Sequence, residues 1–157
     1  MGYKKGAIGE NFFSSLLYAC GIKYNFVDDW YDYLVEDIKV EVKSCQLTIK
    51  GTSKLKGKEL KEGYKIGQFD FTSKENRERI IKEDVWIALI VRHRRQCIFY
   101  GFIKGSQLNG SRYLTLHKAR DLKPINLNEW ILINNLKKDY TGKCVHCGTD
   151  LLHPCDL

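Results

Sequence analysis

The sequence predicts an α/β fold in which helices flank a mixed β-sheet. An N-terminal segment has apolar residues at helical spacing, several short segments rich in β-branched and aromatic residues follow it, and a second helical segment interrupts those strands. The chain has 157 residues, of which 43% are hydrophobic and 12% aromatic. This length and composition suit a folded domain with a buried core and exclude a disordered chain.

Each element follows from a local pattern of residues. Apolar side chains at helical spacing predict a first helix over residues 8–20, which ends at Gly21. A second helix is predicted from the capping box Thr72-Ser73-Lys74-Glu75 to Lys82, and a third over residues 126–136. The lysine-rich segment from residue 50 to residue 65 is expected to be a loop. The predicted strands are residues 23–28, 31–35, 38–45, 64–71, 85–91, 97–103 and 112–117.

Charge and patterning narrow the class of protein. The formal net charge of +7 favours a polyanionic partner, of which nucleic acid is the commonest. The longest apolar run, Val85 to Val91, is too short to cross a bilayer, and the N-terminus lacks a signal-peptide pattern, so an intracellular protein without a membrane partner is expected. Gly51 and Gly57 are one residue too far apart for a phosphate-binding loop, and Glu59 occupies its Ser or Thr position. No nucleotide cofactor is therefore expected.

Residues 32–46 are predicted to form a hairpin that gathers charged side chains. With Glu36-Asp37 at its tip, the numbers of paired residues add up to 73, so Asp32 lies opposite Glu41. Lys43 is two residues further along the strand and therefore points to the same face as Glu41. Two adjacent carboxylates repel each other unless a cation lies between them, and oxygen ligands favour Mg²⁺.

Alternatives to this hairpin site remain open. The charged residues can form an ordinary solvated strand face, or Asp28 or Asp29 in the preceding turn can replace Asp32 as the acid. The hairpin register places neither of these two aspartates opposite Glu41. Gln46 has the opposite parity along the strand, so at most a supporting contact is expected of it.

An aspartate at the start of one strand and E-x-K on the next resemble the core of the PD-(D/E)xK nuclease superfamily, here through Asp32, Glu41 and Lys43. Tyr31 stands where that superfamily has a proline. The chain is most similar to the archaeal Holliday-junction resolvases and the restriction-endonuclease-like proteins near them. Those proteins carry a further acidic residue on a leading helix, matched here by Glu10 at the margin of the apolar stripe. The resemblance covers roughly the first half of the chain.

The resemblance implies a fold, an activity and partners. The fold is a restriction-endonuclease-like mixed sheet flanked by helices, and the activity is hydrolysis of DNA phosphodiester bonds by a junction-resolving, restriction or repair endonuclease. Asp32 and Glu41 would bind Mg²⁺ or Mn²⁺, and Glu10 and Lys43 would complete the catalytic set. A junction resolvase acts on two strands symmetrically, so a homodimer is expected. The alternatives are a basic DNA-binding module without catalysis and an enzyme that cleaves RNA.

Basic residues in two predicted loops are candidates for phosphate contacts. Loops can present such side chains from adaptable positions, although solvated turns are the alternative interpretation of both clusters. The candidate residues are Lys54, Lys56, Lys58 and Lys61 in the lysine-rich loop, and Arg92, Arg94 and Arg95 between two strands.

The C-terminal tail has the spacing of a zinc knuckle. Cys144 and Cys147 form a C-x-x-C-G pattern, and His153 and Cys155 are candidates for the third and fourth ligands of a structural Zn²⁺, with His146 in reserve. Free thiols or a disulfide are the alternatives. The predicted organisation is a nuclease-like core over residues 1–122, followed by a C-terminal helix and this cysteine-rich tail over residues 123–157.

Overall fold

A computed structural model describes residues 7–27, 29–53 and 61–137. The side chains of residues 51–53 and 61–64 are not among those described. A five-stranded sheet forms the centre of the fold, in the order β1-β2-β3-β7-β8. β3 and β7 are parallel and the other neighbours antiparallel, so the predicted mixed sheet of an α/β fold is confirmed. The strands of this sheet are β1 (Tyr24–Phe26), β2 (Tyr33–Val35), β3 (Ile38–Gln46), β7 (Trp86–His93) and β8 (Gln96–Lys104).

Helices cover both faces of this sheet. On one face, Phe13 of α1 and Trp130 of α4 pack in a common core with alternate residues of β3 and β7. On the other face, Ile80 of α2 and Ala119 of α3 pack against the remaining residues of β7. The helices are α1 (Ala7–Ala19), α2 (Lys74–Lys82), α3 (Leu116–Asp121) and α4 (Leu127–Ile133), with a 3-10 turn, η1 (Gly105–Gln107). None of the helices in the described parts of the chain has the length and hydropathy needed to span a membrane.

The continuous apolar run of β7 reflects burial on both faces of the sheet. Ala88 and Ile90 belong to the core beneath α1 and α4, whereas Ile87, Leu89 and Val91 belong to the core beneath α2 and α3. A central strand with such neighbours has no solvated side, so alternation with polar residues is absent. β7 thereby fixes the position of β3, its parallel neighbour, inside the molecule.

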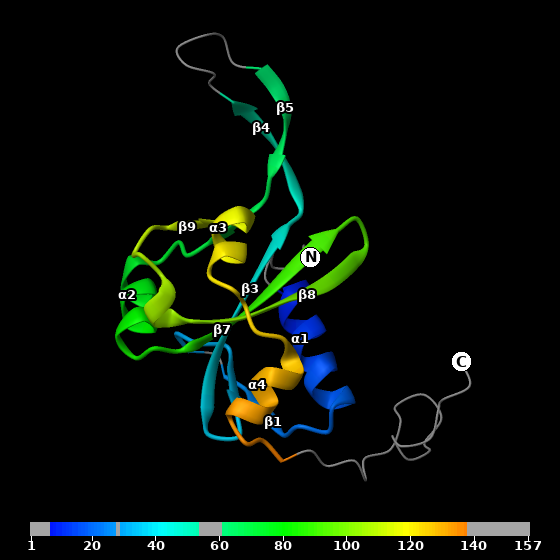
Figure 1. Ribbon diagram of the computed structural model, residues 1–157, viewed down its shortest axis with the longest axis vertical. Helices are drawn as coiled ribbons and strands as arrows, with labels where there is room; N and C mark the ends of the chain where they lie inside the picture. Colours follow the sequence, from blue (N-terminus) through cyan, green and yellow to red (C-terminus); the bar gives the residue numbers. More distant parts are fainter. Residues whose placement is uncertain (1–6, 28, 54–60, 138–157) are drawn as a thin grey trace, which may run out of the picture.

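The expectation of a loop over residues 50–65 is wrong. β4 (Thr48–Ser53) and β5 (Lys61–Ile66) pair antiparallel and form a ribbon that projects beyond the central sheet (Figure 1). Ile49 and Ile66 favour extended backbone, and among the described side chains of the ribbon those of Thr48, Lys50, Lys65 and Ile66 are exposed, so this part of the ribbon needs no hydrophobic face. The many lysines of this segment led to the prediction of a loop, although the segment contains two strands.

The predicted single strand over residues 64–71 is also divided. β5 ends at Ile66, and β6 (Gln68–Asp70) pairs instead with β9 (Tyr113–Thr115). Gly67 lies between them against the backbone of β3, where a Cβ atom would lie 1.6 Å from the carbonyl oxygen of Gln46. Only glycine allows this close approach. At Gly67 the strand partner of the chain changes from β4 to β9.

Other predicted elements are present with shifted ends. The strand predicted over residues 112–117 stops at Thr115, because its hydroxyl accepts the N–H of Lys118 and caps α3. The last helix is shorter than predicted and has Asn126 as its N-cap. The predicted division after residue 122 falls between α3 and α4. Trp130 of α4 stacks on Phe102 of β8, with ring centroids 4.2 Å apart.

Candidate active site

The hairpin of β2 and β3 has the predicted register. Tyr33 pairs with Val40 and Val35 with Ile38, so the numbers of paired residues add up to 73. Glu36 at the tip adopts a left-handed φ of 53°, which allows the chain to reverse tightly. The backbone N–H of Asp32 donates to the carbonyl oxygen of Val40 at 3.1 Å. Asp32 therefore lies beside Glu41 at the place where β2 begins.

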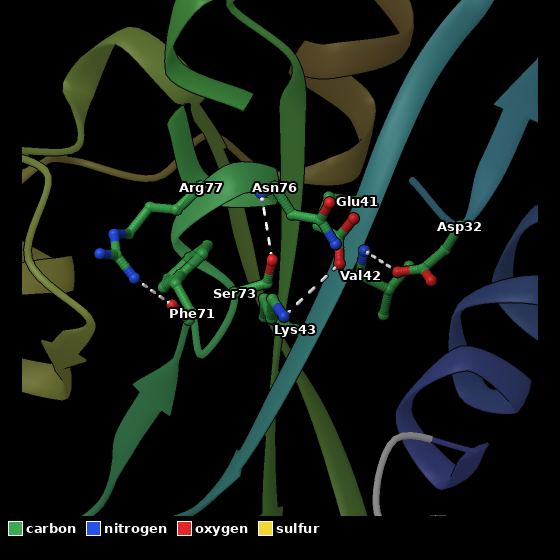
Figure 2. A network of polar contacts seen from close by, with 8 residues as sticks. All are labelled: Asp32, Glu41, Val42, Lys43, Phe71, Ser73, Asn76 and Arg77. Atoms are coloured by element: carbon green, nitrogen blue, oxygen red, sulfur yellow. Dashed lines mark hydrogen bonds and ion pairs between the residues drawn. The ribbon is translucent and has the colours of Figure 1, made fainter. Parts of the chain in front are cut away.

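The edge of β3 opens directly after this point. β2 pairs only with residues 38–40 of β3, so the following residues of β3 have a strand partner only in β7. The N–H of Val42 donates instead to Oδ2 of Asp32 at 2.7 Å (Figure 2). A backbone donor thus fixes one oxygen of the carboxylate, and the same carboxylate shares a side-chain hydrogen bond with Glu41.

Asp28 and Asp29 are the alternatives to Asp32 as the acid beside Glu41, and of these two the structure describes Asp29. Oδ1 of Asp29 accepts the N–H of the next residue, Trp30, at 2.8 Å, and Asp29 does not line the cleft described below. Asp28 lies outside the described residues. Among the described candidates, Asp32 is the aspartate beside Glu41.

Glu41 is a buried carboxyl group whose ionisation is strongly disfavoured. The residue is only 7% exposed, and its Oε1 lies 3.6 Å from Nζ of Lys43. Burial, followed by the charge of Asp32, raises the pKa of Glu41 to about 8, although Lys43 acts in the opposite direction. A cation bound between the two carboxyl groups would remove this repulsion and favour the ionised form.

Lys43 is held on the same face of β3 as Glu41. Its Nζ lies 5.3 Å from the centre of the Phe71 ring, and its side chain is 26% exposed (Figure 2). Contact with an aromatic face favours an ammonium group and restricts its range. The amine is therefore positioned close to the carboxyl groups and remains accessible from the cleft.

A single cleft brings the predicted catalytic residues together. It has a volume of about 720 Å³ and follows the open edge of β3. Glu10 reaches it from α1, which packs on the opposite face of the sheet from the side chains of Glu41 and Lys43. The lining residues are Glu10, Asp32, Glu41, Val42, Lys43, Ser44, Cys45, Gln46, Ile49, Gln68, Asp70, Thr72 and Arg92.

Close packing of α1 on β3 puts Glu10 at this cleft. A Cβ atom on Gly9 would lie 2.7 Å from Cβ of Ser44, so the helix approaches the strand more closely than any other residue allows. The hydroxyl of Tyr33 donates to the carbonyl oxygen of Glu10 at 2.9 Å, which ties the helix to β2. Glu10 lines the same cleft as the hairpin acids Asp32 and Glu41, and its catalytic role stays a prediction.

Asp70 is a cleft residue that the sequence analysis missed. Arg112 donates to its two carboxylate oxygens at 2.9 and 3.1 Å. The hydrogen bond from Arg112 is the main cause that lowers the pKa of Asp70, so this acid is ionised and already paired. No sequence signal identifies Asp70, because its place at the cleft depends on the change of partner at Gly67 and on the pairing of β6 with β9.

Gln46 and Arg92 also reach the cleft, although one has the wrong parity for the face of Glu41 and the other was expected in a loop. The cleft runs along the edge of β3 rather than over one face, so residues of both parities border it. Gln46 and Arg92 are register partners in β3 and β7. Parallel pairing therefore brings Arg92 to the candidate site.

The other predicted basic residues are less informative. Arg94 adopts a left-handed φ of 57° in the turn between β7 and β8, and Arg95 beside it is exposed. Lys61 is in β5, but its side chain is not among those described. Lys54, Lys56 and Lys58 lie outside the described residues, as do the predicted zinc ligands Cys144, Cys147, His153 and Cys155 and the reserve ligand His146.

The donor set at the cleft fits a cation that needs few protein ligands. In the described part of the chain, no group of three or more His, Cys, Asp or Glu side chains has the spacing of a metal site. The two adjacent carboxyl groups are Asp32 and Glu41, and burial is the main cause that raises the pKa of Glu41. Mg²⁺ is commonly held by one or two carboxylates, with waters and substrate phosphates completing its shell.

No protein-family model, curated protein or solved structure matches this chain. The resemblance to PD-(D/E)xK nucleases therefore rests on Glu10, Asp32, Glu41 and Lys43 and on the order of the elements around them. The restriction-endonuclease-like form of the α/β fold stays a prediction.

Proposed function

We propose that the protein is a metal-dependent endonuclease that hydrolyses phosphodiester bonds in DNA. One observation carries the proposal: the buried carboxyl group of Glu41 lies beside Asp32 and 3.6 Å from Lys43, at a cleft open along a strand edge. A buried acid with a raised pKa, next to a second acid and an amine, lowers the stability of the folded protein. Such groups are typical of catalytic sites.

Each of the four side chains has a distinct task in this proposal. Asp32 and Glu41 would bind Mg²⁺ or Mn²⁺, which when bound polarises a phosphate oxygen and activates a water molecule. Lys43 would orient the attacking water or stabilise the charge that develops on the phosphate oxygens. Glu10, from the other side of the cleft, would hold a water molecule of the metal's shell.

The net charge of +7 and the presence of Arg92 at the cleft support a nucleic-acid substrate. DNA is the substrate proposed, and matched duplexes that differ only in the 2′-OH would separate DNA cleavage from RNA cleavage. The narrower proposal, a Holliday-junction resolvase, requires a homodimer with two-fold symmetry. Sedimentation of the protein with and without a four-way junction tests that requirement.

A basic DNA-binding module without catalysis is the second candidate. The formal net charge of +7 supports a DNA partner whether or not the protein cleaves it. This candidate predicts strong, salt-dependent binding of DNA and no cleavage with either Mg²⁺ or Mn²⁺. The first candidate predicts binding and metal-dependent cuts.

The deciding experiment incubates the protein with supercoiled plasmid, linear duplex and a four-way junction, in Mg²⁺, in Mn²⁺ and in EDTA. Cleavage is expected with metal only, and Glu41→Gln is expected to lower its rate by about 100-fold or more. Glu78→Gln is the matched control, because this carboxylate of α2 is 66% exposed and does not line the cleft. Equal rates for wild type and Glu41→Gln would refute the assignment of the site.

A further inference from the structure

A second cavity adjoins the cleft beyond the end of β3. It has a volume of about 470 Å³ and shares Gln46 and Arg92 with the cleft. Two arginines and a histidine border it, and none of the described residues that line it carries a carboxylate. The lining residues are Gln46, Leu47, Thr48, Arg92, His93 and Arg94.

Arg92 has a buried donor that the described residues do not satisfy. Its Nε is buried without a hydrogen-bond partner, and Arg92 takes part in none of the ion pairs among the described residues. Buried donors are paired in most proteins, so an unpaired one indicates a water molecule or an anion that completes it. The planar guanidinium group, with donors in a fork, matches the oxygens of a phosphate.

The nearest buried thiol does not supply the missing negative charge. Cys45 lies close enough to Arg92 for the guanidinium to favour the thiolate, yet burial is the larger effect and raises the pKa of Cys45 to about 12. The thiol therefore stays neutral at physiological pH. An anion beside Arg92 must come from outside the described part of the chain.

The backbone holds Arg92 at a defined distance from the candidate acids. Gln46 and Arg92 are register partners at the ends of β3 and β7, and the N–H of Leu47 donates to the carbonyl oxygen of Arg92 at 2.8 Å. The five residues of strand from Glu41 to Gln46 span about 16 to 17 Å at about 3.3 Å per residue. Phosphates of one DNA strand rise about 3.4 Å and turn about 36° per nucleotide, so those two or three nucleotides apart lie roughly 13 to 18 Å from each other and cover this distance.

We propose that the second cavity is a phosphate-binding subsite, in which Arg92 binds a backbone phosphate two or three nucleotides from the phosphate held at the candidate active site. Gln46 and Thr48 supply uncharged polar groups at its rim, and Arg94 adds positive charge from the adjoining turn. The identity of the ligand as a nucleic-acid strand rests on the proposed function. The need of the buried Nε of Arg92 for an acceptor, a water molecule or an anion, is independent of that function.

Binding of a fluorescent duplex in EDTA tests the subsite without requiring cleavage. Arg92→Gln is expected to weaken binding about 10-fold and to reduce the slope of log affinity against log salt by about one. Arg92→Lys keeps the charge and loses the fork, so an intermediate affinity is expected. Arg120→Gln is the matched control, because the side chain of this residue of α3 is 68% exposed and borders neither cavity, so its loss should change affinity less than about twofold.

A scan of single methylphosphonates, which remove one phosphate charge at a time, locates the contact. In the wild type, a methylphosphonate two or three nucleotides from the cut should weaken binding. Where no cut is seen, the distance is counted from the second position at which a methylphosphonate strongly weakens binding. In Arg92→Gln the same substitution should have no further effect. Equal losses in Arg92→Gln and Arg120→Gln, or additive losses at every position, would overturn the subsite.

Two controls separate the possible failures. The first control measures melting temperatures in inorganic phosphate. If the cavity is a site for free phosphate, phosphate will raise the melting temperature of the wild type, and the methylphosphonate scan will show no sensitive position that depends on Arg92. That result refutes the proposed ligand. Cuts in DNA by both wild type and Arg92→Gln with equal affinities would refute the subsite alone. A protein that binds no DNA at any salt concentration refutes both the subsite and the proposed function.

Discussion

The carboxylate of Asp32 accepts the backbone N–H of Val42 at 2.7 Å and so continues the β-ladder after the last paired residues of β2 and β3. This bond has two consequences. It stabilises the place where the two strands separate, and it holds an acid beside Glu41 at the mouth of the cleft. The structural task of Asp32 and its proposed catalytic task therefore fall on one side chain, and different substitutions separate them.

Asp32→Asn should abolish activity without unfolding the protein. The amide oxygen can still accept the N–H of Val42, so the free energy of unfolding should change by less than about 1 kcal/mol, whereas metal-dependent cleavage should fall about 100-fold. Asp32→Ala, which leaves that N–H unpaired, should cost about 1 to 2 kcal/mol in addition. Urea unfolding and the plasmid assay measure the two effects. An active Asp32→Asn would show that the residue serves only the ladder.

The stability of the metal-free protein should depend on pH through Glu41. Its pKa rises from 4.5 in the unfolded chain to about 8 in the folded one, so the folded state binds the proton more tightly between these values. The stabilisation is complete below about pH 4.5 and is lost as the pH rises through 8. The difference in unfolding free energy between wild type and Glu41→Gln should therefore shift by roughly 1 to 4 kcal/mol between pH 5 and 8.5. A difference that is constant with pH would contradict this prediction.

Metal should stabilise the protein more strongly at high pH. Binding of Mg²⁺ or Mn²⁺ by Asp32 and Glu41 requires that Glu41 lose its proton, so the rise in melting temperature relative to EDTA should be larger at pH 8.5 than at pH 6.5. Glu41→Gln should remove this rise, and Glu78→Gln, at an exposed position, should preserve it. A metal-induced rise of the same size in Glu41→Gln would place the metal elsewhere.

Gly9→Ala should move α1 away from β3, and Ser44→Gly should restore its position. Alanine favours a helix by about 1 kcal/mol over glycine. At this position, however, its Cβ would lie 2.7 Å from Cβ of Ser44, which the strand backbone holds in place. A net loss of about 1 to 3 kcal/mol is expected, together with lower activity because Glu10 is displaced. The double variant Gly9→Ala/Ser44→Gly should recover both, and a stabilised Gly9→Ala would contradict the close approach.

The sequence by itself determined the parts of the candidate site that depend on neighbouring residues. Alternation along a strand puts Glu41 and Lys43 on one face, and the acidic turn at Glu36 sets the register that brings Asp32 beside them. The helical period likewise placed Glu10 at the margin of an apolar stripe. These relations follow from local geometry, because the period of a strand or a helix is the same in every fold.

Only the tertiary structure decided what else reaches the cleft. Arg92 meets Gln46 through the parallel pairing of β3 with β7, and Asp70 arrives through the pairing of β6 with β9 after the chain changes partner at Gly67. The ribbon of β4 and β5 was not predicted for a related reason, since its exposed side chains show no hydrophobic period. Contacts between distant segments depend on which surfaces are buried together, and no local pattern of residues records that choice.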